Sequence, residues 1–184
     1  MGSIEIMLFK EVIRGLRAYY PNADDTQKVI LDSAMVAAGA DAIGGIIPGL
    51  AIPATIVACF GAVWVMYGRL CSTLGISLRE NVLKLLARAV LANIAANLGG
   101  VFAASFIGMW IPFASMLVSA GVVFVTVGLA GLIFLRMILS LAKKSSDPYT
   151  FSDLSESEME STARYTNVSK GDFEAMKRAY KSSR

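Results

Sequence analysis

The most apolar part of the chain runs from residue 89 to residue 135, and no residue in it is charged. A helix that crosses a lipid bilayer needs about 20 mostly apolar residues, so this part is long enough for two such helices. A bend is expected between Met109 and Pro112, because proline removes a backbone donor and the tryptophan in this segment favours a membrane interface. Arg88 precedes the stretch and Arg136 follows it, so both ends are expected on the same side of the membrane.

A second apolar region covers residues 28–69, and two arrangements compete for it. Residues 47–68 alone have the length of a single span, whereas the whole region forms a hairpin if the chain bends between Pro48 and Pro53. Cytoplasmic loops collect Lys and Arg. Only the hairpin places the basic N-terminus on the same face as the basic loop 69–88, so we prefer the hairpin.

The N-terminal segment has the pattern of an amphipathic helix. Residues 3–20 place apolar side chains at helical spacing, with the basic side chains largely on the other side. Such a helix lies either on an anionic membrane surface or against its own protein, and both alternatives are open. The residues expected to contact a membrane surface, here and at the ends of the apolar helices, are Lys10, Arg14, Arg17, Arg69, Arg88 and Arg136.

These patterns predict an all-α membrane protein with three parts. The parts are an amphipathic N-terminal helix and linker (1–27), a membrane domain (28–142) and a polar cytoplasmic tail (143–184). The membrane domain consists of a hairpin (28–69), a basic loop (69–88) and a second hairpin (89–136). The tail carries basic and acidic residues in nearly equal number, which is typical of a solvated docking or regulatory segment. We expect it to be helical or disordered, with Ser169 and Asp172 spaced to cap a last helix.

The composition supports a membrane protein and excludes most chemistry. Of the 184 residues 55% are hydrophobic and 17% are charged, against about 25% charged in a typical soluble domain. There is no histidine, and Cys59 and Cys71 do not form a disulfide framework or a zinc or haem site of the usual kind. No phosphate-binding loop or nucleophile elbow is present. We therefore expect no enzyme activity, catalytic residue, metal or cofactor, and no nucleic-acid partner.

Small residues recur every four positions in both halves of the membrane domain. In lipid, this spacing lets two helix backbones approach closely and gain packing contacts. The pattern predicts tight packing, either within one subunit or between subunits of a homo-oligomer. The residues are Ala92, Ala96, Gly100, Ala104 and Gly108 in the second half and Ala54, Ala58 and Ala62 in the first.

Asp41 is the one charged residue between Ser33 and Gly68. A carboxylate in hydrocarbon is costly and needs a partner or a raised pKa. Asn93 and Asn97 are four residues apart, share a helical face, and would hydrogen-bond to Asp41 if the two hairpins pack together. This polar cluster is either a proton or cation site or a structural hydrogen bond near the interface.

The first half also resembles a known family. The residues that carry the resemblance are an alanine-rich helix, the Ile47-Pro48-Gly49 turn, a returning helix and the ending Tyr67-Gly68-Arg69. The second half agrees more loosely, at 97–99, 111–112 and 126–128, and the similarity covers about residues 28–140. The pattern resembles the family of unknown function typified by the YcjF inner-membrane protein, whose members also occur behind Era-like GTPase domains. The resemblance implies a bacterial α-helical membrane domain with a GTPase or another cytoplasmic protein acting in trans.

Three functional hypotheses follow. The first is a membrane scaffold, shaper or anchor that inserts two helical hairpins from the cytoplasmic face of the inner membrane and self-associates through the small residues. The second is a channel or pore-forming oligomer in which Asp41, Asn93 and Asn97 line a polar path. The third is a soluble oligomer that buries the apolar runs in a protein core; we disfavour it because the uncharged stretch is longer than a soluble hairpin normally buries.

Overall fold

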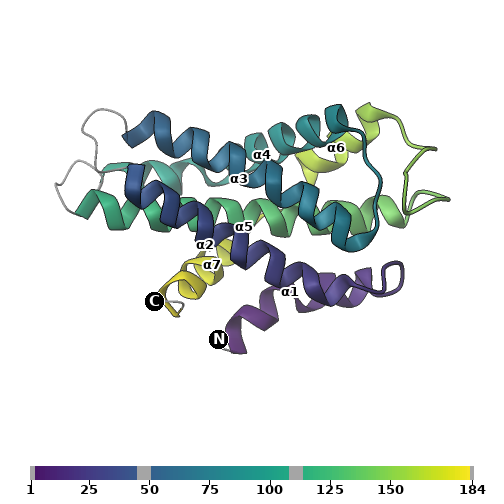
Figure 1. Ribbon diagram of the computed structural model, residues 1–184, viewed down its shortest axis with the longest axis horizontal. Helices are drawn as coiled ribbons and strands as arrows, with labels where there is room; N and C mark the ends of the chain where they lie inside the picture. The colour runs from purple at the N-terminus through teal and green to yellow at the C-terminus, as the bar shows by residue number, and fades with distance from the viewer. Residues whose placement is uncertain (1–2, 45–50, 108–113, 183–184) are drawn as a thin grey trace.

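The computed structural model describes residues 3–44, 51–107 and 114–182, with side chains described at 9–40, 59–97 and 120–182. These residues form seven α-helices, one short 3₁₀ helix and no strand, which confirms the predicted all-helical fold (Figure 1). The elements are α1 (Ser3–Leu16), η1 (Ala23–Asp25), α2 (Thr26–Gly44), α3 (Ala51–Leu74), α4 (Glu80–Ile107), α5 (Ala114–Ala142), α6 (Glu156–Tyr165) and α7 (Lys170–Ser182).

Helix α5 lies at the centre of the fold, and all six other α-helices pack against it (Figure 1). Its segment Ala120–Ala142 is long and apolar enough to cross a membrane, and no other helix in the described part of the chain passes the same test. The most apolar window of this segment has a mean hydropathy of 2.5, and 78% of it is buried. A core helix of a soluble protein has the same properties. The membrane architecture of the two hairpins therefore stays a prediction.

The contact between α2 and α5 depends on a glycine. A Cβ atom on residue 131 would lie 2.7–2.9 Å from three side-chain atoms of Ile30, which is closer than real Cβ contacts come. Ile30 is fully buried, and Ala34 and Ala38 on the same face of α2 are also buried. Small residues thus bring α2 close to α5.

Helix α3 is joined to α5 by one buried tyrosine. Tyr67 is fully buried, its ring stacks on Phe134 at a centroid distance of 4.1 Å, and its hydroxyl donates a hydrogen bond of 3.1 Å to the carbonyl oxygen of Ala130. A net contribution of about 1 kcal/mol is typical of such a bond. We expect Tyr67→Phe to lower the free energy of unfolding by about that amount, measured by urea unfolding in mild detergent. An unchanged stability would show that the stacked ring alone matters.

The connection between α3 and α4 is shorter than the predicted basic loop 69–88. Helix α3 ends at Leu74, where Gly75 adopts a φ of 71° and the backbone N–H of Ile76 donates back to Cys71 at 2.8 Å. Helix α4 begins at Glu80, and an ion pair of 2.6 Å between Glu80 and Lys84 supports its first turns. Arg69 therefore lies in α3 and Arg88 in α4, and only residues 75–79 connect the two helices.

The N-terminal helix packs against its own protein, the second of the two alternatives left open by its pattern. Phe9 and Leu16 on its apolar face are fully buried, and the helix contacts α5 and α7. Lys10 and Arg14 are exposed, as expected for the polar face. Arg17 is also exposed and forms an ion pair of 2.5 Å with Asp24.

The tail is helical, and both of its helices pack on the bundle: α6 on α4 and α5, and α7 on α5 and α1. The predicted cap of the last helix is confirmed. The backbone N–H of Ser169 donates to the Asp172 carboxylate at 2.9 Å, and the backbone N–H of Asp172 donates to the Ser169 hydroxyl at 3.1 Å. The tail is therefore part of the fold, because its apolar side chains cover the central helices.

The two predicted bends lie largely outside the residues that the structure describes. Pro48 and the segment from Met109 to Pro112 lie outside the described residues. Pro53 lies in the first turn of α3, where a proline is tolerated because the first N–H groups of a helix have no partner within it.

Candidate membrane-facing surface and tail contacts

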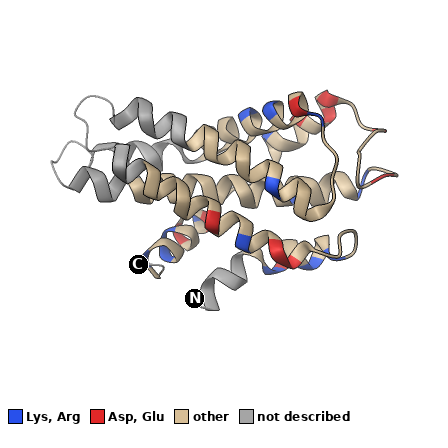
Figure 2. Ribbon diagram, viewed as in Figure 1, with Lys and Arg blue, Asp and Glu red and all other residues tan. Residues whose placement is uncertain are grey.

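Each of three consecutive long helices has an arginine next to a long segment without charge. Beyond Arg69, Arg88 and Arg136, the helical residues 51–68, 89–107 and 114–135 carry no charge. At a rise of 1.5 Å per residue these segments are about 27–33 Å long, close to the thickness of the hydrocarbon core of a bilayer. Figure 2 shows the charged residues of α3 and α4 toward the end where these helices are joined.

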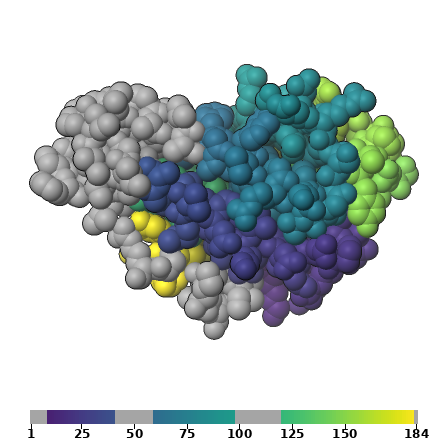
Figure 3. Space-filling model, in the orientation of Figure 1, coloured from purple at the N-terminus to yellow at the C-terminus, as the bar shows by residue number. Residues whose placement is uncertain are grey.

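Helices α2 and α3 also present an apolar face to the outside. Its large side chains are exposed by 39% to 71%, and an added Cβ at any of its glycines would meet no atom within 4 Å. Figure 3 shows the two helices side by side on one face of the molecule, and they pack against each other. We call this surface the α2–α3 apolar face. Its residues are Met35, Val36, Gly39, Phe60, Gly61, Val65 and Gly68.

The predicted small-residue stripes are placed only in part. Ala92 and Ala96 are exposed on α4, and Ala62 on α3 is half-buried. The side chains or positions of Ala54, Ala58, Gly100, Ala104 and Gly108 lie outside the described residues. The exposed alanines leave room for a second helix, but the stripe as a whole stays a prediction.

Of the predicted polar cluster, the structure brings Asn93 and Asn97 together and joins them to the tail. The side-chain amide of Asn93 donates to the carbonyl oxygens of Ala163 at 2.9 Å and Thr166 at 2.8 Å. Asn97 donates to the Asn93 side-chain oxygen at 2.7 Å. Asn93 therefore satisfies carbonyl groups at the C-terminal end of α6, which have no partner within that helix. The Asp41 side chain lies outside the described residues, so its proposed contact with the asparagines remains a prediction.

Arg136, predicted to contact the membrane surface, binds the tail through its guanidinium. Its two terminal nitrogens donate to the two carboxylate oxygens of Asp172 at 2.9 and 2.8 Å, and one of them also donates to the carbonyl oxygen of Asn167 at 2.8 Å. Burial raises the pKa of Asp172, but hydrogen bonds from Arg136 and Ser169 outweigh this effect, so the pKa lies below its usual value. This bidentate ion pair fixes the start of α7 beside Arg136, where the uncharged part of α5 ends.

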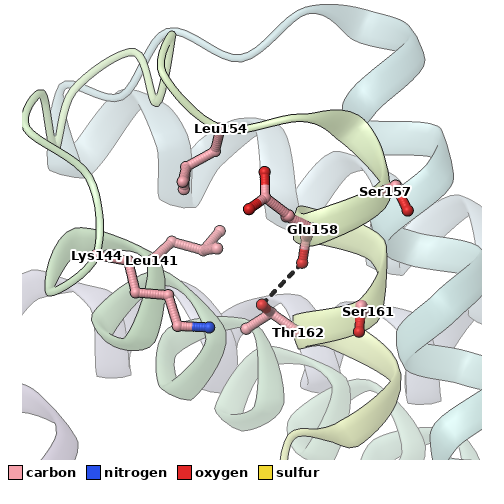
Figure 4. A pocket seen from close by; sticks show the side chains of 7 residues that line it. All are labelled: Leu141, Lys144, Leu154, Ser157, Glu158, Ser161 and Thr162. Atoms are coloured by element: carbon pink, nitrogen blue, oxygen red, sulfur yellow. Dashed lines mark hydrogen bonds between the residues drawn. The ribbon is translucent and has the colours of Figure 1, made fainter.

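The described residues offer little chemistry. No group of three or more Cys, Asp or Glu side chains among them could hold a metal ion. A hollow of about 270 Å³ lies between the end of α5 and α6 (Figure 4). The hydroxyl of Thr162 in its wall already has a partner, because it donates a hydrogen bond of 2.8 Å to the Glu158 carbonyl oxygen of its own helix. Glu158 itself caps α6 by accepting from Ser155. Cys59 and Cys71 are buried free thiols, and burial raises the pKa of Cys71 to about 12.

Comparison with known proteins adds no assignment: no protein-family model, curated protein or solved structure matches this chain. The resemblance to the YcjF family therefore stays a prediction.

Proposed function

We propose that this chain is a non-enzymatic membrane protein that acts as a scaffold, shaper or anchor at the bacterial inner membrane. The uncharged parts of α3, α4 and α5 enter the bilayer together with the adjoining apolar part of α2, and both termini stay in the cytoplasm. The observation that carries the proposal is that three helices remain uncharged over a bilayer's thickness beyond Arg69, Arg88 and Arg136.

Lipid is the partner that best fits the α2–α3 apolar face. A soluble protein rarely leaves large apolar side chains together on its surface, whereas the same side chains are stable against acyl chains. Arg69 is exposed at the end of this face, where it can interact with anionic headgroups. The α2–α3 apolar face would thus contact acyl chains, and Arg69 at its end would contact the headgroups.

Self-association and a partner in trans are further parts of the proposal. Ala92 and Ala96 on α4 and the open glycines of the α2–α3 apolar face are positions where a helix of a second copy can approach closely. The resemblance to the YcjF family supports a GTPase or another cytoplasmic protein as the partner at the charged end. The channel alternative has less support, because the side-chain amide of Asn93 donates its hydrogen bonds to carbonyl oxygens of the tail and not to a polar path.

A pair of matched aspartates in α3 tests the membrane contact. Gly61 is exposed with open space around it and lies about 12 Å beyond Arg69 along the helix, whereas Ser72 is exposed on the other side of Arg69. An Asp at the centre of a spanning helix costs about 2.5–3.5 kcal/mol. We expect Gly61→Asp to reduce flotation with vesicles of phosphatidylcholine and phosphatidylglycerol at least tenfold, and Ser72→Asp to have little effect.

Neither substitution removes a packing contact, so both variants should remain folded, which circular dichroism checks. Equal flotation of the two aspartate variants would contradict the insertion of this half of α3. Wild-type protein that remains in the aqueous fraction would reject the membrane function and support the soluble oligomer.

A further inference from the structure

Helix α7 lies along the part of α5 that the proposed function places in the membrane. The ion pair with Asp172 is at Arg136, Met176 lies over Gly128, and Tyr180 lies over Gly121. The ring of Tyr180 also packs on Phe124 at a centroid distance of 5.2 Å. The contacts of α7 are therefore distributed over about 22 Å of α5, from Arg136 to Gly121 within the uncharged segment.

The outer face of α7 is incompatible with hydrocarbon. Glu174, Lys177, Arg178 and Lys181 are exposed along it. Each charged side chain near the centre of a bilayer costs about 2.5–3.5 kcal/mol. While α7 is docked, the uncharged part of α5 cannot enter a bilayer without taking these charges with it.

We propose that α7 is a displaceable cover of α5. In the membrane-free protein α7 covers Gly121, Phe124 and Gly128 of α5, and acyl chains take its place when α5 enters the bilayer. The inference rests on the proposed membrane function and adds a conformational step to it.

The contacts of α7 are arranged for a pivot at its N-terminal end. The hydrogen bonds that hold this end involve Ser169, Asp172 and Arg136, all at the border of the uncharged segment. Farther along α7, Met176 contacts Gly128, and the ring of Tyr180 contacts Gly121 and Phe124. Lipid can replace the apolar contacts while the ion pair stays at headgroup level.

The released helix has a new surface to bind. Phe173, Met176 and Ala179 form its buried apolar face, and basic side chains dominate its outer face. A basic amphipathic helix of this kind lies stably on an anionic membrane surface. When α7 is released, its apolar face leaves α5 and contacts the membrane interface, so it does not become exposed to water.

A disulfide between residues 128 and 176 tests the cover directly. The Cγ atom of Met176 lies 3.0 Å from the position that a Cβ on residue 128 would take. In a disulfide the sulfur of one cysteine lies about 3 Å from the Cβ of the other, so Gly128→Cys with Met176→Cys can be bridged. The native Cys59 and Cys71 are replaced by alanine in this variant and in its control.

The control pair is Gly15→Cys with Leu139→Cys, which joins α1 to α5 beyond Arg136. The Cγ atom of Leu139 lies 3.5 Å from the corresponding Cβ position on residue 15, so this bridge is similar in geometry. This bridge does not hold any segment against the uncharged part of α5. The two bridges therefore differ in which segment of α5 they hold.

Each full-length variant is oxidised in detergent and diluted into vesicles of phosphatidylcholine and phosphatidylglycerol. Insertion is measured by resistance to carbonate extraction and by quenching of Trp110 with lipids brominated along the acyl chain, in a Trp64→Phe background. We expect the 128–176 bridge to lower carbonate-resistant protein at least tenfold, with recovery after dithiothreitol. The 15–139 bridge should leave insertion unchanged.

Equal insertion of the oxidised and reduced 128–176 variant would overturn the cover and leave the membrane function standing. Vesicle binding by the reduced variant without carbonate resistance or quenching would also overturn the cover, because α5 would then be a permanent core helix. Failure of every form to bind vesicles would overturn the membrane function, and the cover with it.

Discussion

Replacing Gly131 with alanine is expected to destabilise the fold by about 2–3 kcal/mol, at the upper end of the usual cost of overpacking. The added Cβ would lie 2.7 and 2.8 Å from the two Cγ atoms of Ile30. These atoms are bonded to the branched Cβ of Ile30, so they cannot swing away as the end of a flexible side chain does. Helix α2 would have to shift from the central helix. Urea unfolding in mild detergent measures the loss.

The same substitution at Gly61 provides the matched control. Gly61 also lies inside a long helix, but an added Cβ there meets no atom within 4 Å. Alanine is favoured over glycine by about 0.5–1 kcal/mol in a helix interior, so Gly61→Ala is expected to stabilise the protein. The two variants should therefore change stability in opposite directions. A stabilising Gly131→Ala would show that α2 does not approach α5 as closely as described.

Local patterns predicted much of this fold. The helical spacing of apolar residues in 3–20 predicts the apolar side of α1, and Phe9, Ile13 and Leu16 on that side are buried. The spacing of Ser169 and Asp172 predicted the cap of α7, because a capping box is formed by residues three apart. Such features involve side chains within one or two helical turns, so the sequence contains all the partners.

Contacts between distant segments could not be predicted in this way. The sequence predicts that Arg136 lies at the membrane surface, and it does not indicate the ion pair with Asp172 in the tail. It predicts that Asn93 belongs to a cluster with Asp41, and it does not indicate the hydrogen bond that the Asn93 amide donates to α6. In each case the residue type indicated a polar partner, and only the packing of the tail on α4 and α5 determines which partner it meets.

The burial of α5 shows why hydropathy alone did not distinguish a membrane span from a core. The scale records how poorly a segment interacts with water, and this property is the same for a helix covered by lipid and one covered by protein. What separates the two states is the charge on the covering surface. Lys177 and Arg178 on the outside of α7 are compatible with water around the covered helix and incompatible with acyl chains.

Replacing Asp172 with asparagine is expected to lower the free energy of unfolding by about 2 kcal/mol at neutral pH. The variant keeps the shape of the side chain but leaves the guanidinium of Arg136, which is 27% exposed, without its counter-charge. Hydrogen bonds to charged groups contribute about 1.5–3 kcal/mol. Hydrogen exchange should report the loss first in residues 170–182, since the ion pair holds the start of α7.

The pH dependence identifies the carboxylate as the cause. The pKa of Asp172 is lowered in the folded protein, so its contribution is fully present above the unfolded value of about 3.9 and is lost as the pH falls through the folded value. The difference in stability between wild type and Asp172→Asn should therefore be constant near neutral pH and shrink below about pH 4. Asp153, whose pKa is lowered to about 2 by hydrogen bonds from Ser145 and Ser146, titrates in both proteins and cancels from the difference. A difference that persisted in acid would mean that asparagine perturbs the helix cap with Ser169, and that the charge of Asp172 contributes little to holding α7.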